Sequence, residues 1–167
     1  TGKLVAFCSC VLLQVPQLGE VIHLGLTCIE PELRGGGLSH RLAGNLLTRY
    51  VVTRHGLGKA WMTSVGCVLS ILGNLARLFE RVYPSPRHAQ PFAPEVDLIA
   101  TEFDRQFRHI AYVQPWAVFE RESFVFRGSG RGTAFQKEAE ATEFHHRDPA
   151  ILTKRCTHFS TIVSKPR

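Results

Sequence analysis

The feature that most constrains the fold is a run of three glycines, Gly35 to Gly37, between two segments of different hydrophobic periodicity. Residues 20–29 are largely apolar and rich in β-branched side chains, which predicts a buried strand. Pro31 prevents this strand from continuing as a paired one. From Leu38 the apolar residues recur at a spacing of three to four, which predicts an amphipathic helix over 38–54. The chain therefore places a strand, a glycine-rich turn and a helix in direct succession.

This succession is suited to binding an anion. The first turn of a helix has backbone N–H groups without an intrahelical acceptor, and the helix dipole is positive there. Glycines before the helix let phosphate oxygens approach the main chain, because no Cβ is in the way. The amides of residues 35–39 are therefore expected to bind a phosphate or pyrophosphate group. A tight connection without any ligand is the alternative interpretation of the same glycines.

The remaining pattern predicts an α/β fold in which helices flank a mixed central sheet. The order strand, strand, helix, strand, helix implies at least one right-handed crossover between parallel strands. Residues 1–84 are expected to form the core, and residues 85–167 are expected to complete the sheet within one compact domain. The other expected elements are strands over 4–14, 59–69, 110–119 and 123–127, and helices over 71–82, 94–109 and 135–144.

The net charge indicates the class of partner, and the cysteine content indicates the cellular compartment. The net charge of +6 and the isoelectric point near 9.4 favour anionic partners. An odd number of cysteines in mostly apolar segments indicates reduced, buried thiols and a cytoplasmic setting. The apolar segment 4–15 is interrupted by polar residues and is too short to span a bilayer, so no membrane association is expected. The five cysteines are Cys8, Cys10, Cys28, Cys67 and Cys156.

The segment from Ile29 to Leu42, I-E-P-E-L-R-G-G-G-L-S-H-R-L, resembles the acetyl-CoA signature of the GNAT acetyltransferases. The core pattern of that family is Q/R-x-x-G-x-G/A. Arg34 and Gly37 match it, while Ser39 stands where the family usually has glycine or alanine. The resemblance covers roughly residues 1–84. It implies a GNAT-like acyl-CoA N-acyltransferase fold without the usual N-terminal elements, acetyl-CoA as co-substrate, an amine of a small molecule or protein as acceptor, and no metal.

The resemblance also implies which residues contact the cofactor. The end of the strand, at Cys28 and Ile29, would pair with the pantetheine arm. Family members place an asparagine before the second helix, and Asn74 falls about two residues later than that spacing expects. The residues implied to bind the pyrophosphate are Arg34, Gly35, Gly36, Gly37, Leu38 and Ser39.

Acetyl transfer needs a base for the amine and an acid for the departing thiolate. Glu20 and His23 lie on the strand that enters the loop and are the candidate bases, although a lone histidine on a strand more often has a structural role. Relatives often carry a tyrosine in a run such as L-Y-E-R, and this chain has Phe79 at that place, which cannot donate a proton. Tyr83 is the candidate substitute if the second helix extends that far. A module that binds CoA without turnover is therefore a second hypothesis.

Other clusters support weaker hypotheses. The segment 127–132, R-G-S-G-R-G, also fits R-x-x-G-x-G, but few large apolar residues follow it, so an exposed hairpin or linker with an additional anionic contact is expected. A basic nucleic-acid-binding domain ranks last, because no recognisable motif interleaves aromatic and basic residues. A homodimer is compatible with the sequence. The spacing of His145, His146, Asp148, Cys156 and His158 matches no zinc pattern.

Overall fold

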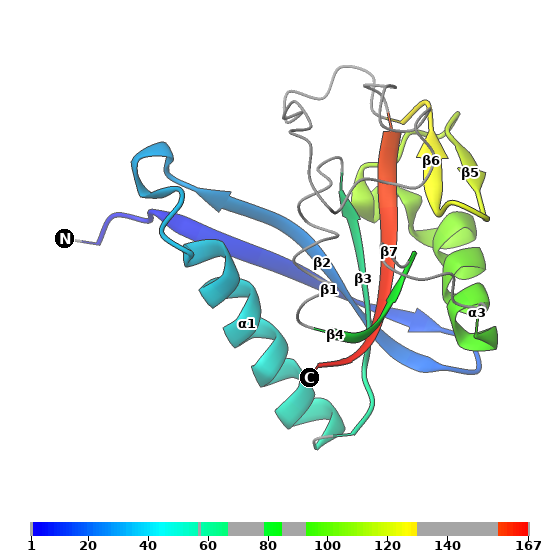
Figure 1. Ribbon diagram of the computed structural model, residues 1–167, viewed down its shortest axis with the longest axis horizontal. Coiled ribbons are helices and arrows are strands. Elements are labelled where there is room, and N and C mark those ends of the chain that lie inside the picture. Colours follow the sequence, from blue (N-terminus) through cyan, green and yellow to red (C-terminus); the bar gives the residue numbers. More distant parts are fainter. Residues whose placement is uncertain (1, 57, 67–78, 85–92, 130–156, 167) are drawn as a thin grey trace.

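The computed structural model describes residues 2–56, 58–66, 79–84, 93–129 and the backbone of 157–166. In these residues seven strands form one mixed sheet in the order β1-β2-β3-β7-β6-β5, and β4 also pairs with β7 (Figure 1). The expectation of a mixed α/β fold is confirmed. The strands are β1 (Ala6–Val15), β2 (Gly19–Ile29), β3 (Trp61–Gly66), β4 (Phe79–Tyr83), β5 (Val118–Glu120), β6 (Val125–Arg127) and β7 (Thr157–Pro166).

Two helices flank this sheet, and each continues into a segment of different helical geometry. Helix α1 begins directly after the glycines, and helix α3 begins at a proline, whose fixed φ suits the first helical turn. Both lie where the hydrophobic periodicity predicts a helix. The helical segments are α1 (Leu38–Tyr50) with a π-helical turn (Val51–His55), and α3 (Pro94–Glu102) with a π-helical turn (Phe103–Phe107) and a 3-10 turn (Arg108–Ala111).

The sheet contains one parallel pair. β1 and β2 form an antiparallel hairpin, and α1 then connects β2 to β3, which runs parallel to it. β3 pairs antiparallel with β7, the last strand of the chain. On its other edge β7 pairs with β4 and with β6, both antiparallel. One sheet therefore contains strands from both halves of the sequence.

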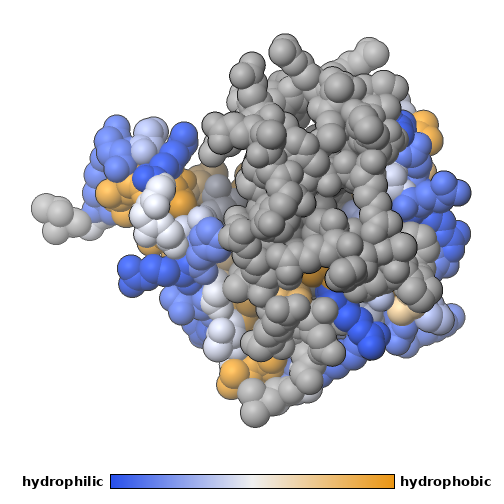
Figure 2. All heavy atoms as spheres, in the orientation of Figure 1, coloured by the Kyte–Doolittle hydropathy of each residue, from blue (hydrophilic) through white to orange (hydrophobic). Residues whose placement is uncertain are grey.

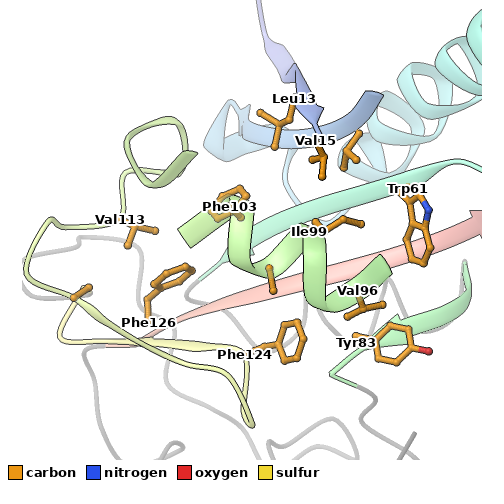
Figure 3. Packing of buried hydrophobic residues seen from close by; sticks show 13 residues of the cluster. Leu13, Val15, Trp61, Tyr83, Val96, Ile99, Phe103, Val113, Phe124 and Phe126 are labelled. Carbon is orange, nitrogen blue, oxygen red and sulfur yellow. The ribbon is translucent and has the colours of Figure 1, made fainter. Parts of the chain in front are cut away.

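Apolar side chains cover both faces of this sheet. Neighbouring residues of one strand point to opposite faces, so Val21 packs on the α3 side while Ile22 packs on the α1 side. Trp61 and Met62 of β3 also pack on opposite faces, Trp61 on the α3 side and Met62 on the α1 side. Figure 3 shows the larger cluster, in which α3 lies against the sheet. Its buried members include Leu13, Val15, Val21, Trp61, Tyr83, Val96, Ile99, Phe103, Val113, Phe124 and Phe126.

The expected helix over 71–82 is wrong at its end. Residues 71–78 lie outside the described residues, but Phe79–Tyr83 is strand β4. Val82 packs in the α1-side cluster and Tyr83 in the α3-side cluster. The apolar residues Phe79, Val82 and Tyr83 stand at i, i+3 and i+4, the spacing of a helix face, so periodicity favours the wrong element here.

The expected strand over 110–119 is wrong over most of its length, since only its last two residues belong to β5. The preceding residues form a loop that Arg108 holds in place. Its guanidinium Nη1 donates to the carbonyl oxygens of Pro115 and Ala117 at 3.2 and 2.7 Å, while Asp104 accepts from the same side chain. The expected strand over 123–127 is present as β6, and the expected helix over 135–144 lies outside the described residues.

The expectation of buried thiols is also wrong where the structure tests it. Cys10 and Cys28 are exposed and Cys8 is half-buried, each as a free cysteine. All three lie on the β1–β2 hairpin, where one face of the sheet extends beyond the helices that cover its centre (Figure 1). Cys67 and Cys156 lie outside the described residues.

Candidate functional site

The candidate site begins where β2 and β3 separate. The two strands pair at only three positions, Ile22 with Met62, His23 with Thr63 and Leu24 with Ser64. Beyond Leu24, β2 continues alongside β1 to Ile29, whereas β3 continues alongside β7. Figure 1 shows the two strands diverging toward their C-terminal ends. The main chain of β2 is therefore unpaired with β3 along the last part of its length.

A β-bulge lies at the start of this divergence. From Cys8 to Cys10, β1 advances by two residues, whereas the partner position on β2 moves by three residues, from Thr27 to Leu24. β2 thus has one extra residue at Gly25–Leu26, directly after its last contact with β3. A bulge bends a strand and increases its twist, which carries β2 away from β3.

Ser9 holds the bulge from the neighbouring strand. Its Oγ donates to the carbonyl oxygen of Leu26 at 3.2 Å. A Cβ on Gly25 would lie 2.6 Å from this Oγ, so a side chain there would displace the Ser9 hydroxyl from its hydrogen bond. Beyond the bulge the side chains of residues 25–28 are exposed. Cys28 and Ile29, the residues implied to contact pantetheine, lie on this free part of β2.

The glycine loop lies at the same end of the sheet. A 3-10 turn over Pro31–Leu33 follows β2, and two glycines then take positive φ angles, Gly35 at 85° and Gly37 at 73°. The first helical hydrogen bond runs from the Arg41 N–H to the Gly37 carbonyl oxygen at 3.2 Å. In the described part of the chain, the N–H groups of residues 35–40 donate to no protein acceptor. Residues 35–37 and His40 are exposed and Leu38 and Ser39 are half-buried, and all of them lie at the positive end of the α1 dipole.

The side chains around the loop leave positive charge available. Arg34 donates from Nε to the Ile29 carbonyl oxygen at 3.2 Å, which fixes the loop against the end of β2. Neither Arg34 nor the exposed Arg41 forms an ion pair with the described residues. The Glu30 carboxylate is paired with the Lys3 ammonium at 2.7 Å. Arg34 and Arg41 thus place two guanidinium groups near the loop, and the Glu30 carboxylate is already neutralised, whereas the exposed Glu32 of the 3-10 turn adds one negative charge nearby.

His23 lies in the middle rung of the parallel pair, next to the divergence. Its side chain is 2% exposed, its Nδ1 hydrogen-bonds to the Thr63 Oγ at 2.8 Å, and its ring centroid lies 5.2 Å from that of Phe103. Burial lowers the pKa of His23 to about 4, because the charged form is poorly solvated there. The ring is therefore neutral at physiological pH and is packed as part of the core.

Glu20 lies at the opposite end of β2. It pairs with Gln14 beside the hairpin turn, and Ile29 lies nine positions further along, about 30 Å in a strand. Its carboxylate interacts with Tyr50 at the end of α1. Burial, with added effects of the Glu20 charge and hydrogen bond, raises the pKa of Tyr50 to about 12. The Tyr50 hydroxyl also hydrogen-bonds to Nε2 of His55 at 2.8 Å, so Glu20 belongs to a cluster that anchors the end of the helix.

Tyr83, the candidate acid, lies in strand β4 and not on an extension of the second helix. It is 4% exposed in β4 and packs in the α3-side cluster shown in Figure 3. Phe79, at the start of the same strand, is 5% exposed on the other face. The structure therefore does not bring Glu20, His23 and Tyr83 together. Asn74 lies outside the described residues.

The second glycine segment offers less to an anion. The Arg127 guanidinium forms a two-point ion pair with the Glu120 carboxylate, at 2.8 and 2.7 Å. The side chain of Ser129 is fully buried, and its Oγ accepts from the Gln114 N–H at 3.1 Å. The expectation of an exposed segment is therefore wrong for Ser129. The expected anionic contact stays a prediction, although the Arg127 charge is already paired with Glu120. Residues 130–132 lie outside the described part of the chain.

The described residues contain no group of three or more histidine, cysteine or acidic side chains placed to hold a metal ion. None of their helices has the length and apolar character needed to cross a bilayer.

Sequence reasoning identified the glycine loop but missed the bulge. One signal for it is present, because an isolated glycine within a strand pattern, here Gly25, indicates a bulge or a close approach of another chain segment. The divergence of β2 from β3 has no local signal, since it depends on which strand each of them pairs with.

Searches against protein-family models, curated proteins and solved structures found no match to this chain. A proposal for the function therefore depends on the sequence and geometry of the chain itself.

Proposed function

We propose that this chain is a GNAT-like N-acetyltransferase that binds acetyl-CoA and transfers the acetyl group to an amine. One observation carries the proposal: the bulged, diverging end of β2 and the exposed amides of the glycine loop lie at the same end of the sheet. A pyrophosphate and an extended amide-containing arm are the two parts of CoA that these two features would bind.

Each part of the cofactor has a matching group on the protein. The pyrophosphate would accept hydrogen bonds from the amides of residues 35–39 at the start of α1. The pantetheine arm would add to the free edge of β2 as a short strand does, through main-chain hydrogen bonds over residues 25–29. A backbone N–H near the bulge would then polarise the thioester carbonyl oxygen.

In the reaction, the neutral amine nitrogen attacks the thioester carbonyl carbon and forms a C–N bond. The C–S bond of the tetrahedral intermediate then breaks, the nitrogen loses a proton, and the CoA thiolate gains one. Of the three candidate catalytic residues, His23 is the one next to the divergence, although its low pKa makes it a weak base in the ligand-free protein.

Calorimetric titration with CoA tests the binding step. Gly36 is the best position, because its φ is not positive and an added Cβ would approach no atom closer than 3.8 Å, the Leu33 carbonyl oxygen. Gly36→Glu should weaken CoA binding at least about tenfold, by roughly 1.4 kcal/mol or more, because a carboxylate would face the pyrophosphate. Gly36→Gln controls for size, and Gly44→Glu places the same charge on an exposed part of α1. Unchanged affinity in Gly36→Glu would show that the loop assignment is wrong.

The second candidate function is a module that binds CoA without turnover. The observations in its favour are the burial of Tyr83 in β4 and the remote position of Glu20, which leave neither of them beside the divergence. Release of free thiol from acetyl-CoA in the presence of a panel of amines separates the two functions. Amine-dependent thiol release with any member of the panel would exclude this second candidate.

A further inference from the structure

Two thiols occupy neighbouring positions on one face of the β1–β2 hairpin. Successive residues of a strand point to opposite faces, and Leu13 and Val15 of β1 pack in the α3-side cluster. The even-numbered Cys8 and Cys10 therefore both face the α1 side, about 6.6 Å apart along the strand. The extra residue of the bulge lies in β2, so β1 keeps its alternation here. Cys10 is exposed and Cys8 is half-buried, so an ion in solution can reach both sulfurs.

The third thiol of the hairpin faces the other way. Cys28 pairs with Phe7, an odd-numbered residue of β1. Residues that stand directly opposite each other in an antiparallel pair share a face of the sheet. Cys28 therefore lies on the face opposite to Cys8 and Cys10. The hairpin thus carries one pair of thiols and one single thiol, which differ in geometry but lie on the same two strands.

The surroundings of the pair favour a bound cation. The Thr27 hydroxyl donates to the Cys8 sulfur at 3.2 Å, and a thiolate accepts such a bond more strongly than a thiol does. Burial raises the pKa of the Cys10 thiol, and the charge of Cys8 raises it further, because two thiolates on one face repel each other. A cation between the two sulfurs would remove this repulsion.

The spacing of the two thiols suits a bridging metal better than a disulfide. A Cα separation of about 6.6 Å, two residues along a strand, lies near the upper end of the range that a disulfide spans. A metal ion that bonds each sulfur at about 2.3 Å lets the sulfurs stay up to about 4.6 Å apart.

The ligand set selects the metal. Structural zinc and iron–sulfur sites are built from four protein ligands. The partners of Cys8 and Cys10 on β2 are Thr27 and Leu24, and neither side chain is a ligand for these metals. Cu(I) is a soft ion that prefers thiolate ligands and is stable with two of them in a linear arrangement.

We propose that Cys8 and Cys10 form a two-coordinate binding site for Cu(I). Each thiol gives its proton to the solvent, and each sulfur forms one bond to the metal, so the occupied site carries one negative charge. Both ligands lie on a paired strand, which fixes their spacing before the metal binds. The site uses no group of the glycine loop and does not depend on the proposed acetyltransferase function.

Anaerobic titration with Cu(I) in competition with a coloured Cu(I) chelator tests this site. The wild-type chain should retain one equivalent of Cu(I) that Cys8→Ser and Cys10→Ser lose. Their affinity should fall at least about a hundredfold, more than the loss of an outer-shell partner costs. Cys28→Ser is the matched control, since it removes a thiol from the same hairpin but from the other face, and should bind as the wild type does. A Cys67→Ser/Cys156→Ser variant should bind likewise.

Two further measurements separate the site from misfolding and from copper bound elsewhere. Cys10 is exposed, so Cys10→Ser should unfold at the wild-type temperature without copper, whereas Cu(I) should raise the Tm of the wild type alone. X-ray absorption of the copper complex should show two sulfur neighbours. A wild type that loses all Cu(I) to the chelator, an equal loss in Cys28→Ser, or three or more sulfur neighbours would overturn the proposal. None of these measurements involves CoA.

Discussion

Both ends of β2 carry apolar side chains, but their surroundings are opposite. Near its start Val21 and Ile22 are 0% and 1% exposed, because β1 and β3 flank the strand and helices cover both faces. Four residues beyond Ile22, Leu26 is 45% exposed, because the strand has left β3. Figure 2 shows apolar surface at the end of the molecule that holds the β2–α1 turn. Burial along this strand is thus determined by its neighbours and not by its own composition.

The comparison suggests a division of roles. The enclosed end of β2 contributes to the free energy of folding, through packing of side chains such as His23 against Phe103. The diverging end leaves backbone groups free for a ligand. Substitutions at the enclosed end should therefore change stability and leave CoA binding intact, whereas substitutions at the diverging end, and at loop positions such as Gly36 that do not need a left-handed glycine, should do the reverse.

The largest effect is expected for Phe103→Ala. Phe103 is 1% exposed and its ring contacts those of His23 and Phe126. Its removal should lower the free energy of unfolding by about 3–5 kcal/mol, through lost apolar burial and the cavity left behind. Denaturant titration measures this. Leu26→Ala, on the diverging segment, is the control and should change stability by no more than about 0.5 kcal/mol. Equal losses in the two variants would contradict the division between the ends of β2.

A slightly smaller effect is expected from the pH dependence of stability. The pKa of His23 is lowered to about 4, against an ordinary value near 6.5. Between these values the unfolded state binds the proton and the native state does not, so stability falls as the pH is lowered from about 6.5 to 4. The loss should reach about 3 kcal/mol. Unfolding at a series of pH values should show this decline in the wild type and a shallower one in His23→Gln.

The control for that experiment is His40→Gln, which removes an exposed imidazole from α1 and should keep the wild-type decline. If His23→Gln kept the full decline as well, the enclosed end of β2 would not exclude the charged imidazole.

The smallest effect is expected within the glycine loop. Gly37 has a φ of 73°, a left-handed conformation that disfavours a side chain, whereas the φ of Gly36 is not positive. Gly37→Ala should therefore destabilise the protein by about 1 kcal/mol, and Gly36→Ala should be close to neutral. Thermal unfolding compares the two. A similar loss in both variants would show that the loop does not depend on a left-handed glycine.

Part of the candidate site could be predicted from local sequence. The glycines, the proline before them and the amphipathic pattern after Leu38 determine a strand, a turn and a helix, because each signal acts within a few residues. The same reasoning failed at Phe79–Tyr83, where the apolar residues have the i, i+3, i+4 spacing of a helix although the segment is a strand. It also failed for the exposure of Cys10 and Cys28, since apolar neighbours in sequence do not ensure a covering layer in space.

The sequence by itself determined the glycine loop, its amides without an intrahelical acceptor before α1, and the uncharged character of the first strand. Only the tertiary structure decided that β2 leaves β3 after Leu24, that His23 is buried and neutral, and that Tyr83 lies in the core. The physical reason is the range of the interactions. Turn chemistry and helix periodicity act between neighbours along the chain, whereas strand pairing and burial depend on β7, which is contributed by the far end of the sequence.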